Sequence, residues 1–198
     1  MPTDAYPQLN APIQIVNHGI PLSEVEAAFA LSEAYFGLPY ESKAAGSIKN
    51  KYGIMPFGHE CPARETDNPK ADLKESLLAS FRADVSDIWP SEAECPGLRE
   101  GLERFKLANS RVNTRMLECF EDGLGLARGT LAAMHAPALA DCLNVTRIMY
   151  YPALTEKTSR ARCSAHTDFC SLTCLFQRPG QPGEWRRFVQ LVPQCVGV

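Results

Sequence analysis

The stretch from Asn144 to Gln177, NVTRIMYYPALTEKTSRARCSAHTDFCSLTCLFQ, decides the fold of this chain. Two apolar, β-prone runs lie in it, residues 145–151 and 172–176, and their residue types and lengths predict strands. Between the runs stands His166-Thr167-Asp168. Residues i and i+2 of an extended backbone point to the same side, so this imidazole and this carboxylate can converge on one ion. The pair supplies two of the three ligands of a 2-His-1-carboxylate iron site.

The sequence around this pair decides its interpretation, because four His and eight Asp in 198 residues give about 0.16 His-x-Asp matches by chance. The order of motifs resembles that of the Fe(II)- and 2-oxoglutarate-dependent dioxygenases of the isopenicillin N synthase-like branch. That branch carries a strand that ends in Tyr-Pro, a loop, His-Thr-Asp, and a Leu-Thr-rich strand that ends near Gln. The matching residues are Tyr150-Tyr151-Pro152, His166-Thr167-Asp168, Leu172-Thr173 and Gln177.

Two earlier segments carry the same resemblance. Residues 14–21, QIVNHGIP, are similar to the family's N-terminal strand and turn, and Asp72-Leu73-Lys74-Glu75 is similar to its Asp-x-Lys-Glu segment. The resemblance therefore runs from about Ile13 to Gln177, with three separated motifs in family order. It implies an α+β fold in which N-terminal helices flank a double-stranded β-helix, or jelly-roll, core.

The resemblance also implies the chemistry of an oxidoreductase. Fe(II) would be the cofactor and 2-oxoglutarate the co-substrate, and a small molecule, set in specialised (secondary) metabolism, would be hydroxylated, desaturated or cyclised. His166 and Asp168 would be metal ligands. Tyr151 would hydrogen-bond the keto acid, although the role of an ordinary strand tyrosine fits it about as well. No residue receives a separate catalytic role.

The family pattern ends near Arg178. No His follows Asp168, so the family's second His ligand has no counterpart, and Arg186 and Arg187 do not form its Arg-x-Ser pattern, so a surface role is preferred for them. We therefore expect a chain truncated at both ends, with the C-terminal strands of the barrel missing. A shifted reading frame, a retained intron or a genuine short form would each explain this. The alternative function is a truncated, non-catalytic family member that acts as a binding or regulatory fragment or has no function.

We expect three regions: residues 1–136 as an N-terminal helical and strand region, 137–177 as the start of the jelly roll, and 178–198 as a divergent tail. Within them, a Ser23/Glu26 capping box should open a helix that ends near Gly37, and the clearest helix should start at Leu98 and end at Gly123 and Gly125. The remaining expected elements are strands at 13–17 and 73–81, a short helix at 41–45 within a long loop from 39 to 70, and a helix at 127–136.

Composition excludes several other classes of protein. Hydrophobic residues make up 45% and charged residues 22%, as in ordinary globular domains. The net charge is −3 and no block of Lys and Arg occurs, so neither nucleic acid nor an anionic membrane is an expected partner. Neither a signal peptide nor a membrane span is visible, which predicts a cytoplasmic protein acting on a small molecule. The oligomeric state stays open.

The cysteines and remaining histidines have structural interpretations. Most of the eight cysteines are expected to be reduced thiols. His18 should hydrogen-bond backbone within its turn, and His135 should cap the end of a helix. A zinc site is an alternative use of His166, with three cysteines as the other ligands, but no Cys-x-x-Cys spacing supports it. Those cysteines are Cys163, Cys170 and Cys174.

Overall fold

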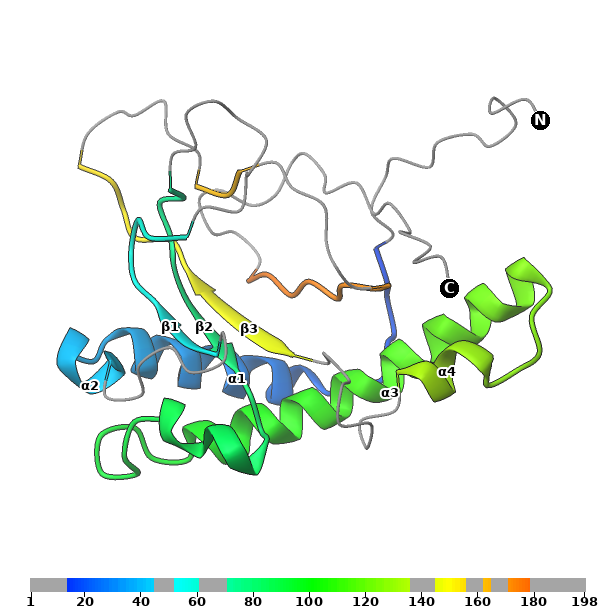
Figure 1. The fold of residues 1–198 in the computed structure, drawn as a ribbon, viewed down its shortest axis with the longest axis horizontal. Coiled ribbons are helices and arrows are strands. Elements are labelled where there is room, and N and C mark those ends of the chain that lie inside the picture. Colours follow the sequence, from blue (N-terminus) through cyan, green and yellow to red (C-terminus); the bar gives the residue numbers. More distant parts are fainter. Residues whose placement is uncertain are drawn as a thin grey trace.

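The structure is a computed structural model, and it describes residues 14–44, 52–60, 71–135, 145–155, 162–164 and 171–178. Helices and strands alternate irregularly along the chain, and the helices lie together below a small sheet (Figure 1). The elements are α1 (Leu22–Phe36), α2 (Tyr40–Ala44), β1 (Gly53–Met55), β2 (Glu75–Ala79), the 3-10 helix η1 (Ala83–Ile88), α3 (Leu98–Leu124), α4 (Thr130–Met134) and β3 (Thr146–Tyr150).

The three strands form an antiparallel sheet in the order β1-β2-β3. In the central strand, Leu77 is paired with Ile54 on one side and Ile148 on the other. Leu77 is fully buried, and its neighbours in the core come from the sheet and from both long helices. Packing of these apolar side chains removes a continuous surface from water. This hydrophobic burial is the main force that holds the sheet and the helices together.

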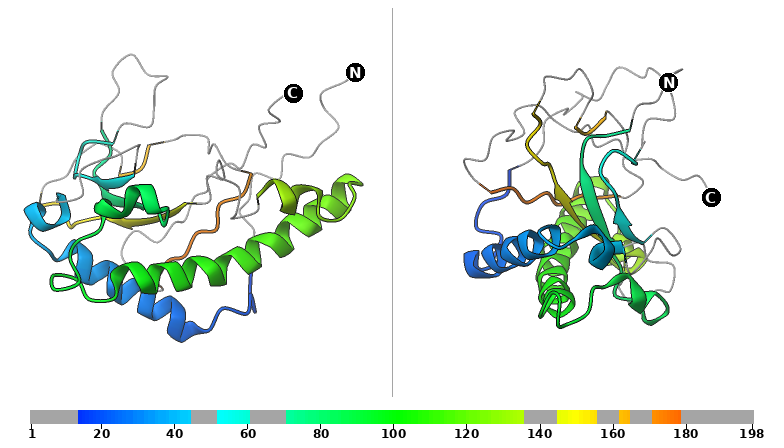
Figure 2. Two further views of the ribbon diagram at one scale, coloured as in Figure 1. Left: turned by 60° about the horizontal axis from the view of Figure 1, so that its bottom comes forward. Right: turned by 90° about the vertical axis from the view of Figure 1, so that its left-hand side faces the viewer.

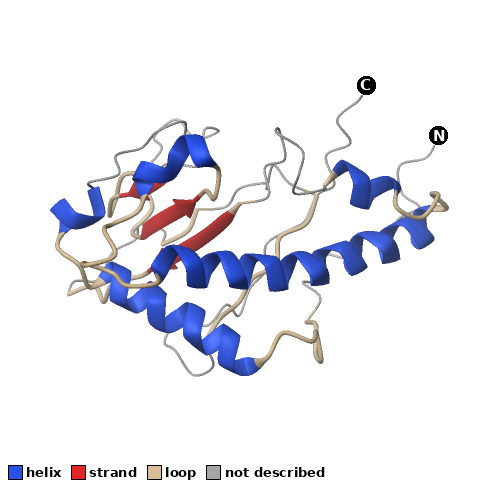
Figure 3. Cartoon of the chain, turned by 90° about the horizontal axis from the view of Figure 1, so that it is seen from below, coloured by secondary structure: helices blue, strands red, loops and turns tan. Residues whose placement is uncertain are grey.

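One face of the sheet is covered by α1 and α3, which pack against each other (Figures 1 and 2). Tyr35 of α1 and Leu98 and Leu102 of α3 reach the core beneath Leu77, and each is buried. The C-terminal half of α3 extends beyond the sheet, and α4 folds back against it (Figure 3). The helices and the sheet thus form two packed layers of one α+β unit.

The α3 prediction is confirmed, because apolar residues recur every three or four positions and Gly125 ends the helix in a left-handed conformation with φ 67°. Gly123 lies inside α3, so it does not end the helix as predicted. The buried carboxylate of Glu121 then accepts backbone N–H groups of Gly129, Leu131 and Ala132 at 2.6–3.1 Å. These bonds satisfy the first amides of α4, which is shorter than the predicted helix at 127–136.

Two predictions near the N-terminus are wrong. Residues 14–17 form no strand, and Val16 is 72% exposed, because an apolar run becomes a strand only where another strand can pair with it. The Ser23/Glu26 capping box is absent: α1 begins at Leu22 with Pro21 at the N-cap and no side-chain cap. Pro21 supplies its carbonyl to the amides of Glu24 and Val25 instead. The predicted end of α1 at Gly37 is confirmed.

The other strand predictions are confirmed in two places and wrong in two. β2 and β3 lie within the predicted strands 73–81 and 145–151, and α2 lies within one residue of the predicted short helix. β1 lies where a loop was predicted. Residues 172–176 pair with none of the described strands, although Leu172, Cys174 and Phe176 are half-buried while the residues between them are exposed.

The described residues agree with the predicted α+β class, with helices beside a small antiparallel sheet. The division of the chain at 136/137 and 177/178 stays a prediction, and residues 179–198 lie outside the described part. Among the helices that the structure describes, none combines the length and apolar character needed to cross a membrane.

Replacing Leu77 by Ala should lower the free energy of unfolding by about 2–5 kcal/mol, because a fully buried Leu leaves a cavity at the sheet–helix contact. The matched control is Leu107→Ala on α3, where the side chain is 53% exposed and the expected change is within about 0.5 kcal/mol. Urea unfolding followed by circular dichroism measures both. Equal losses for the two variants would contradict this assignment of the core.

Candidate functional site

The predicted metal ligands His166 and Asp168 lie outside the described residues, but the chain on both sides of them is described. Ser164 stands two residues before His166, and Ser171 stands three residues after Asp168. Tyr151, the predicted partner of the keto acid, directly follows β3. Tyr151, Ser164 and Ser171, with the residues that they contact, form the described part of the site.

Tyr151 is half-buried, and its hydroxyl faces sulfur atoms. It forms a hydrogen bond with the Cys163 thiol and lies 3.7 Å from the Met149 sulfur. Burial, and then the nearby Cys163, raises the pKa of Tyr151 to about 12. The Arg162 guanidinium lies over the ring, 5.5 Å from its centroid, and donates to the Pro152 carbonyl at 2.7 Å. Tyr151 thus places a neutral phenol next to a cation.

Lys74, immediately before β2, is almost completely buried. Its ammonium lies 2.9 Å from Asp72 Oδ2, 3.2 Å from Glu60 Oε2 and 3.6 Å from Cys163 Sγ. Burial acts to lower the pKa of Lys74, but the hydrogen bond to Asp72 and the charges of Cys163 and Glu60 outweigh it, and the pKa is raised. The ammonium therefore donates to Asp72 Oδ2 and Cys163 Sγ and forms an ion pair with Glu60, whose Oε2 accepts no hydrogen bond from the described part of the chain.

Asp72 is fully buried and uses both carboxylate oxygens. Oδ2 accepts from Lys74, while Oδ1 accepts the backbone N–H of Ser164 at 2.9 Å and its hydroxyl at 2.5 Å. Asp72 thereby joins the segment before β2 to Ser164, which lies 92 residues further along the chain and two residues before His166. Hydrogen bonds to an ionised acceptor in a site closed to water are among the stronger ones in proteins.

Glu60 extends this network to the edge of the sheet, because its Oε1 accepts from Arg147 of β3 at 2.7 Å. The two cations, Arg147 and Lys74, thus alternate with the two carboxylates, Glu60 and Asp72. Lys74 lies between the buried Asp72 and the half-buried Glu60, and Glu60 is paired in turn with Arg147, whose side chain is 36% exposed. Such pairing is the condition for keeping a charge away from water. Sequence reasoning singled out Asp72 and Lys74 as a motif but missed Glu60, Arg147 and Ser164, for which no local pattern gives a signal.

The chain after Asp168 is held by α3 and α4. His135 is the C-cap of α4. Its Nδ1 lies 2.7 Å from the Leu131 carbonyl oxygen, and its Nε2 lies 2.9 Å from Ser171 Oγ. Since a carbonyl only accepts, Nδ1 carries the proton in this arrangement, and Nε2 accepts from the Ser171 hydroxyl. The Cys174 thiol donates to Asn113 of α3 at 2.7 Å. The predicted helix-end role of His135 is confirmed, with Ser171 as an additional partner.

The donor chemistry of His166 and Asp168, an imidazole and a carboxylate, suits Fe(II). Among the described residues, no group of three or more His, Cys, Asp or Glu side chains could hold a metal. Two members of the alternative zinc set are described: Cys163 contacts Lys74, and Cys174 contacts Asn113. Both are free thiols, and burial raises the pKa of each. In the described part of the chain, the contacts of both thiols are therefore to protein groups.

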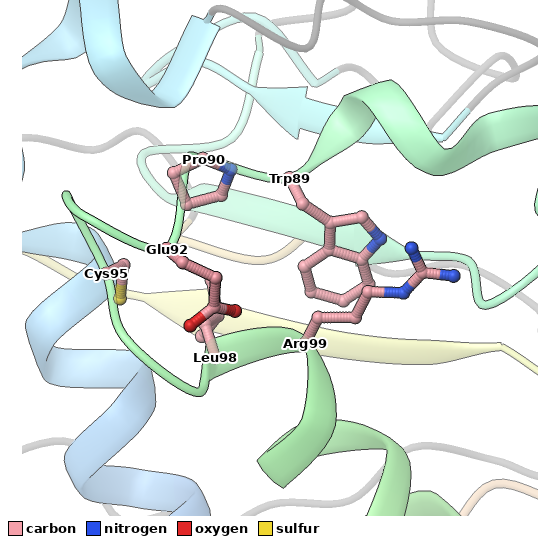
Figure 4. Close-up of a pocket in the computed structure, with 6 residues that line it drawn as sticks. All are labelled: Trp89, Pro90, Glu92, Cys95, Leu98 and Arg99. Carbon is pink, nitrogen blue, oxygen red and sulfur yellow. The ribbon is translucent and has the colours of Figure 1, made fainter.

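His18 fills the turn role predicted for it: its Nδ1 accepts the backbone N–H of Ile20 at 3.1 Å. It also borders a hollow of about 240 Å³ between α1 and the segment 176–178. A second hollow of about 220 Å³ lies at the start of α3, where the Trp89 indole and the Arg99 side chain lie close together (Figure 4). Tyr151, the predicted site residue that the structure describes, lines neither hollow.

The comparisons with known proteins agree with this arrangement. A family described as the N-terminal part of the non-haem dioxygenases in morphine synthesis matches residues 12–93, which include β1, β2 and the Asp72-Lys74 segment. Over residues 12–93 the chain is therefore similar to the N-terminal part of these dioxygenases. This family match places the motif that carries the buried network inside the part of the fold that its members share.

Several curated relatives are fungal proteins. A 2-oxoglutarate-Fe(II) type oxidoreductase from Metarhizium rileyi is 28% identical, over 83% of this chain and 50% of the relative. A 2-oxoglutarate-dependent dioxygenase from a Dothideomycetidae species is 29% identical, over 81% of this chain and 52% of the relative. A proline hydroxylase from Petromyces alliaceus is also 29% identical, over 83% and 53%. The chain thus spans about half the length of these relatives.

Solved structures show the same fold. The crystal structure of a full-length protein from Neurospora crassa, determined in complex with alpha-KG, superposes with a TM-score of 0.62 at 20% identity. The match covers 78% of this chain and 50% of the Neurospora protein. A 2OG-Fe(II) oxygenase family protein from Caulobacter crescentus gives a TM-score of 0.53 at 24% identity, over 71% of this chain and 47% of its own.

Replacing Tyr151 by Phe should change how stability depends on alkaline pH. Because the folded-state pKa is raised from 10.0 to about 12, the stabilisation linked to the protonated phenol is complete below about pH 10 and is lost as the pH rises through about 12. The loss of unfolding free energy over this range should be smaller in Tyr151→Phe than in the parent. Part of the slope should remain, because burial also raises the pKa of Tyr35.

Urea unfolding at a series of alkaline pH values measures this slope. Tyr150→Phe is the matched control, since the neighbouring ring is 44% exposed. An unchanged slope in Tyr151→Phe would contradict the buried, hydrogen-bonded position of the Tyr151 hydroxyl.

Proposed function

We propose that this chain belongs to an oxidoreductase that uses Fe(II) and 2-oxoglutarate to oxidise a small molecule, with His166 and Asp168 as metal ligands and Tyr151 as a partner of the keto acid. The observation that supports this most is that two distant motifs meet at the segment that leads to the third. Asp72 of the Asp-x-Lys-Glu segment binds Ser164, two residues before His166, and the Tyr151 hydroxyl binds Cys163. Nothing in a purely structural role requires these particular motifs to meet.

Each residue has a task that its chemistry suits. Fe(II), when bound with 2-oxoglutarate and O2, supplies the power to oxidise a C–H bond while the keto acid is decarboxylated to succinate. His166 and Asp168 would hold the metal through nitrogen and oxygen. Tyr151 would donate its hydroxyl proton to a carboxylate oxygen of the keto acid. Thiol and thioether sulfur, its present partners, are weak acceptors, so a carboxylate oxygen is the stronger partner for that proton.

The substrate that we propose is a small molecule of specialised metabolism, and the reaction is hydroxylation, desaturation or ring closure. The names of the fungal relatives, among them a proline hydroxylase, support this class of reaction. The cytoplasmic location and the jelly-roll continuation of the sheet remain part of the proposal. The rival function, a binding or regulatory fragment without turnover, predicts that the ligands bind and no succinate forms.

In a longer form of the protein that also supplies the second His ligand, replacing Asp168 by Ala should abolish succinate formation from 2-oxoglutarate and should lower Fe(II) binding, because one of the proposed ligands is lost. Anaerobic addition of Fe(II) and 2-oxoglutarate, followed by the visible metal-to-ligand charge-transfer band and by succinate assay, measures both. Asp122→Ala is the matched control, since Asp122 is an exposed carboxylate paired with Arg128 on the far end of α3, and it should leave both signals unchanged.

Three results would contradict parts of the proposal. Undiminished turnover in Asp168→Ala would remove Asp168 from the site. A charge-transfer band without succinate, in the parent protein, would favour the binding fragment. One tightly held zinc ion in protein purified without chelator, lost in Cys163→Ser, would favour the thiolate site.

A further inference from the structure

Ser164 is held at two points by one buried carboxylate oxygen. Asp72 Oδ1 accepts both its backbone N–H, at 2.9 Å, and its hydroxyl, at 2.5 Å. The two contacts hold the backbone N–H and the side chain of Ser164 against one oxygen atom, so they fix where the segment that follows Ser164 begins. The other oxygen of Asp72 is bound to Lys74, so the carboxylate itself is held in place.

The held residue is close to a proposed metal ligand. His166 is two residues further along the chain, so its Cα lies at most about 7 Å from that of Ser164. On the other side of the pair, Ser171 is bonded to His135, three residues after Asp168. The segment with both proposed ligands therefore begins and ends at anchored serines, one bound to the segment before β2 and the other to the end of α4.

We propose that Asp72 is a positioning residue for His166, acting through its two hydrogen bonds to Ser164. This inference rests on the proposed function for its consequence, although the anchor itself does not need a metal. Residues that orient metal ligands affect metal affinity because a ligand that is already in place loses less conformational freedom on binding. Asp72 belongs to the Asp-x-Lys-Glu motif, and the structure gives that motif a task at the site, namely to set where the metal-bearing segment starts.

A purely structural role for Asp72 makes a different prediction. Asp72 and Lys74 form a buried ion pair, and loss of such a pair lowers stability wherever it stands. A positioning role requires in addition that the Ser164 contacts alone, with the ion pair intact, matter for the metal. Ser164→Ala separates the two roles, because it removes the hydroxyl and leaves Asp72 paired with Lys74. Ser164→Thr keeps a hydroxyl and should rescue.

The experiment measures Co(II) affinity by calorimetry, the thermal midpoint, and the exchange rate of the Ser164 amide in the metal-free protein. Four variants of the full chain are compared with the parent. Ser164→Ala and Asp72→Asn should bind Co(II) about tenfold or more weakly. Asn has one oxygen for the two partners of Asp72, so one contact is lost. Ser164→Thr should stay near the parent. Ser32→Ala is the matched control, since Ser32 donates to the Ala28 carbonyl at 2.7 Å within α1.

In Ser164→Ala the expected result is weaker Co(II) binding and faster exchange of the residue-164 amide, with a thermal midpoint that falls less than in Asp72→Asn, which also disturbs the pair with Lys74. Ser32→Ala should leave affinity and exchange unchanged. Unchanged affinity in both Ser164→Ala and Asp72→Asn would overturn the positioning role. If the parent chain binds no Co(II), the proposed function fails for this chain, and amide exchange decides the anchor alone: faster exchange in both variants supports it, and unchanged exchange overturns it.

Discussion

The burial of the Lys74 ammonium is the constraint on which the rest of this site depends. Moving a charged group out of water costs several kcal/mol, and carboxylates in contact with it must offset that cost. Asp72 and Glu60 do so, but each carboxylate brings a charge and further lone pairs of its own. Glu60 also pairs with Arg147 of β3 through Oε1, and Asp72 accepts hydrogen bonds from Ser164. One buried cation therefore determines how four separate stretches of chain meet.

The stretch from Lys74 to Leu77, at the start of β2, makes contacts on both faces of the sheet. Glu75, the next residue after Lys74, forms a 2.7 Å ion pair with Lys43 of α2, and Leu77 enters the core above α1 and α3. Successive residues of an extended chain point to opposite sides, so one short stretch ties the sheet to the helices on one side and to the site segment on the other.

Sequence predicts those elements that local chemistry determines. Local patterns predict three elements: α3 from its helical period and the Gly125 that follows it, and β2 and β3 from their apolar runs. The segment 172–176 shows the limit, since its alternation survives in the half-burial of Leu172, Cys174 and Phe176, but the pairing that would make it a strand depends on distant residues. Phe176 instead packs on Phe105 of α3.

For the site, too, the sequence predicts only part of the residues. Asp72 and Lys74 could be singled out because they match the family's Asp-x-Lys-Glu segment, and the order of motifs indicates the family. Glu60 and Ser164 are found only when the chain is folded, because their partners are 14 and 92 residues away. Long-range polar contacts carry no periodicity, so composition and spacing cannot reveal them.

A double-mutant cycle between Asp72 and Ser164 tests most directly the claim that Asp72 holds the site segment. The free energies of unfolding of the parent, Asp72→Ala, Ser164→Ala and the double variant give the coupling between the two side chains. Residues in one hydrogen-bonded network couple by about 0.5–3 kcal/mol, and we predict a value in this range. Additive effects, with a coupling within about 0.3 kcal/mol of zero, would contradict the account.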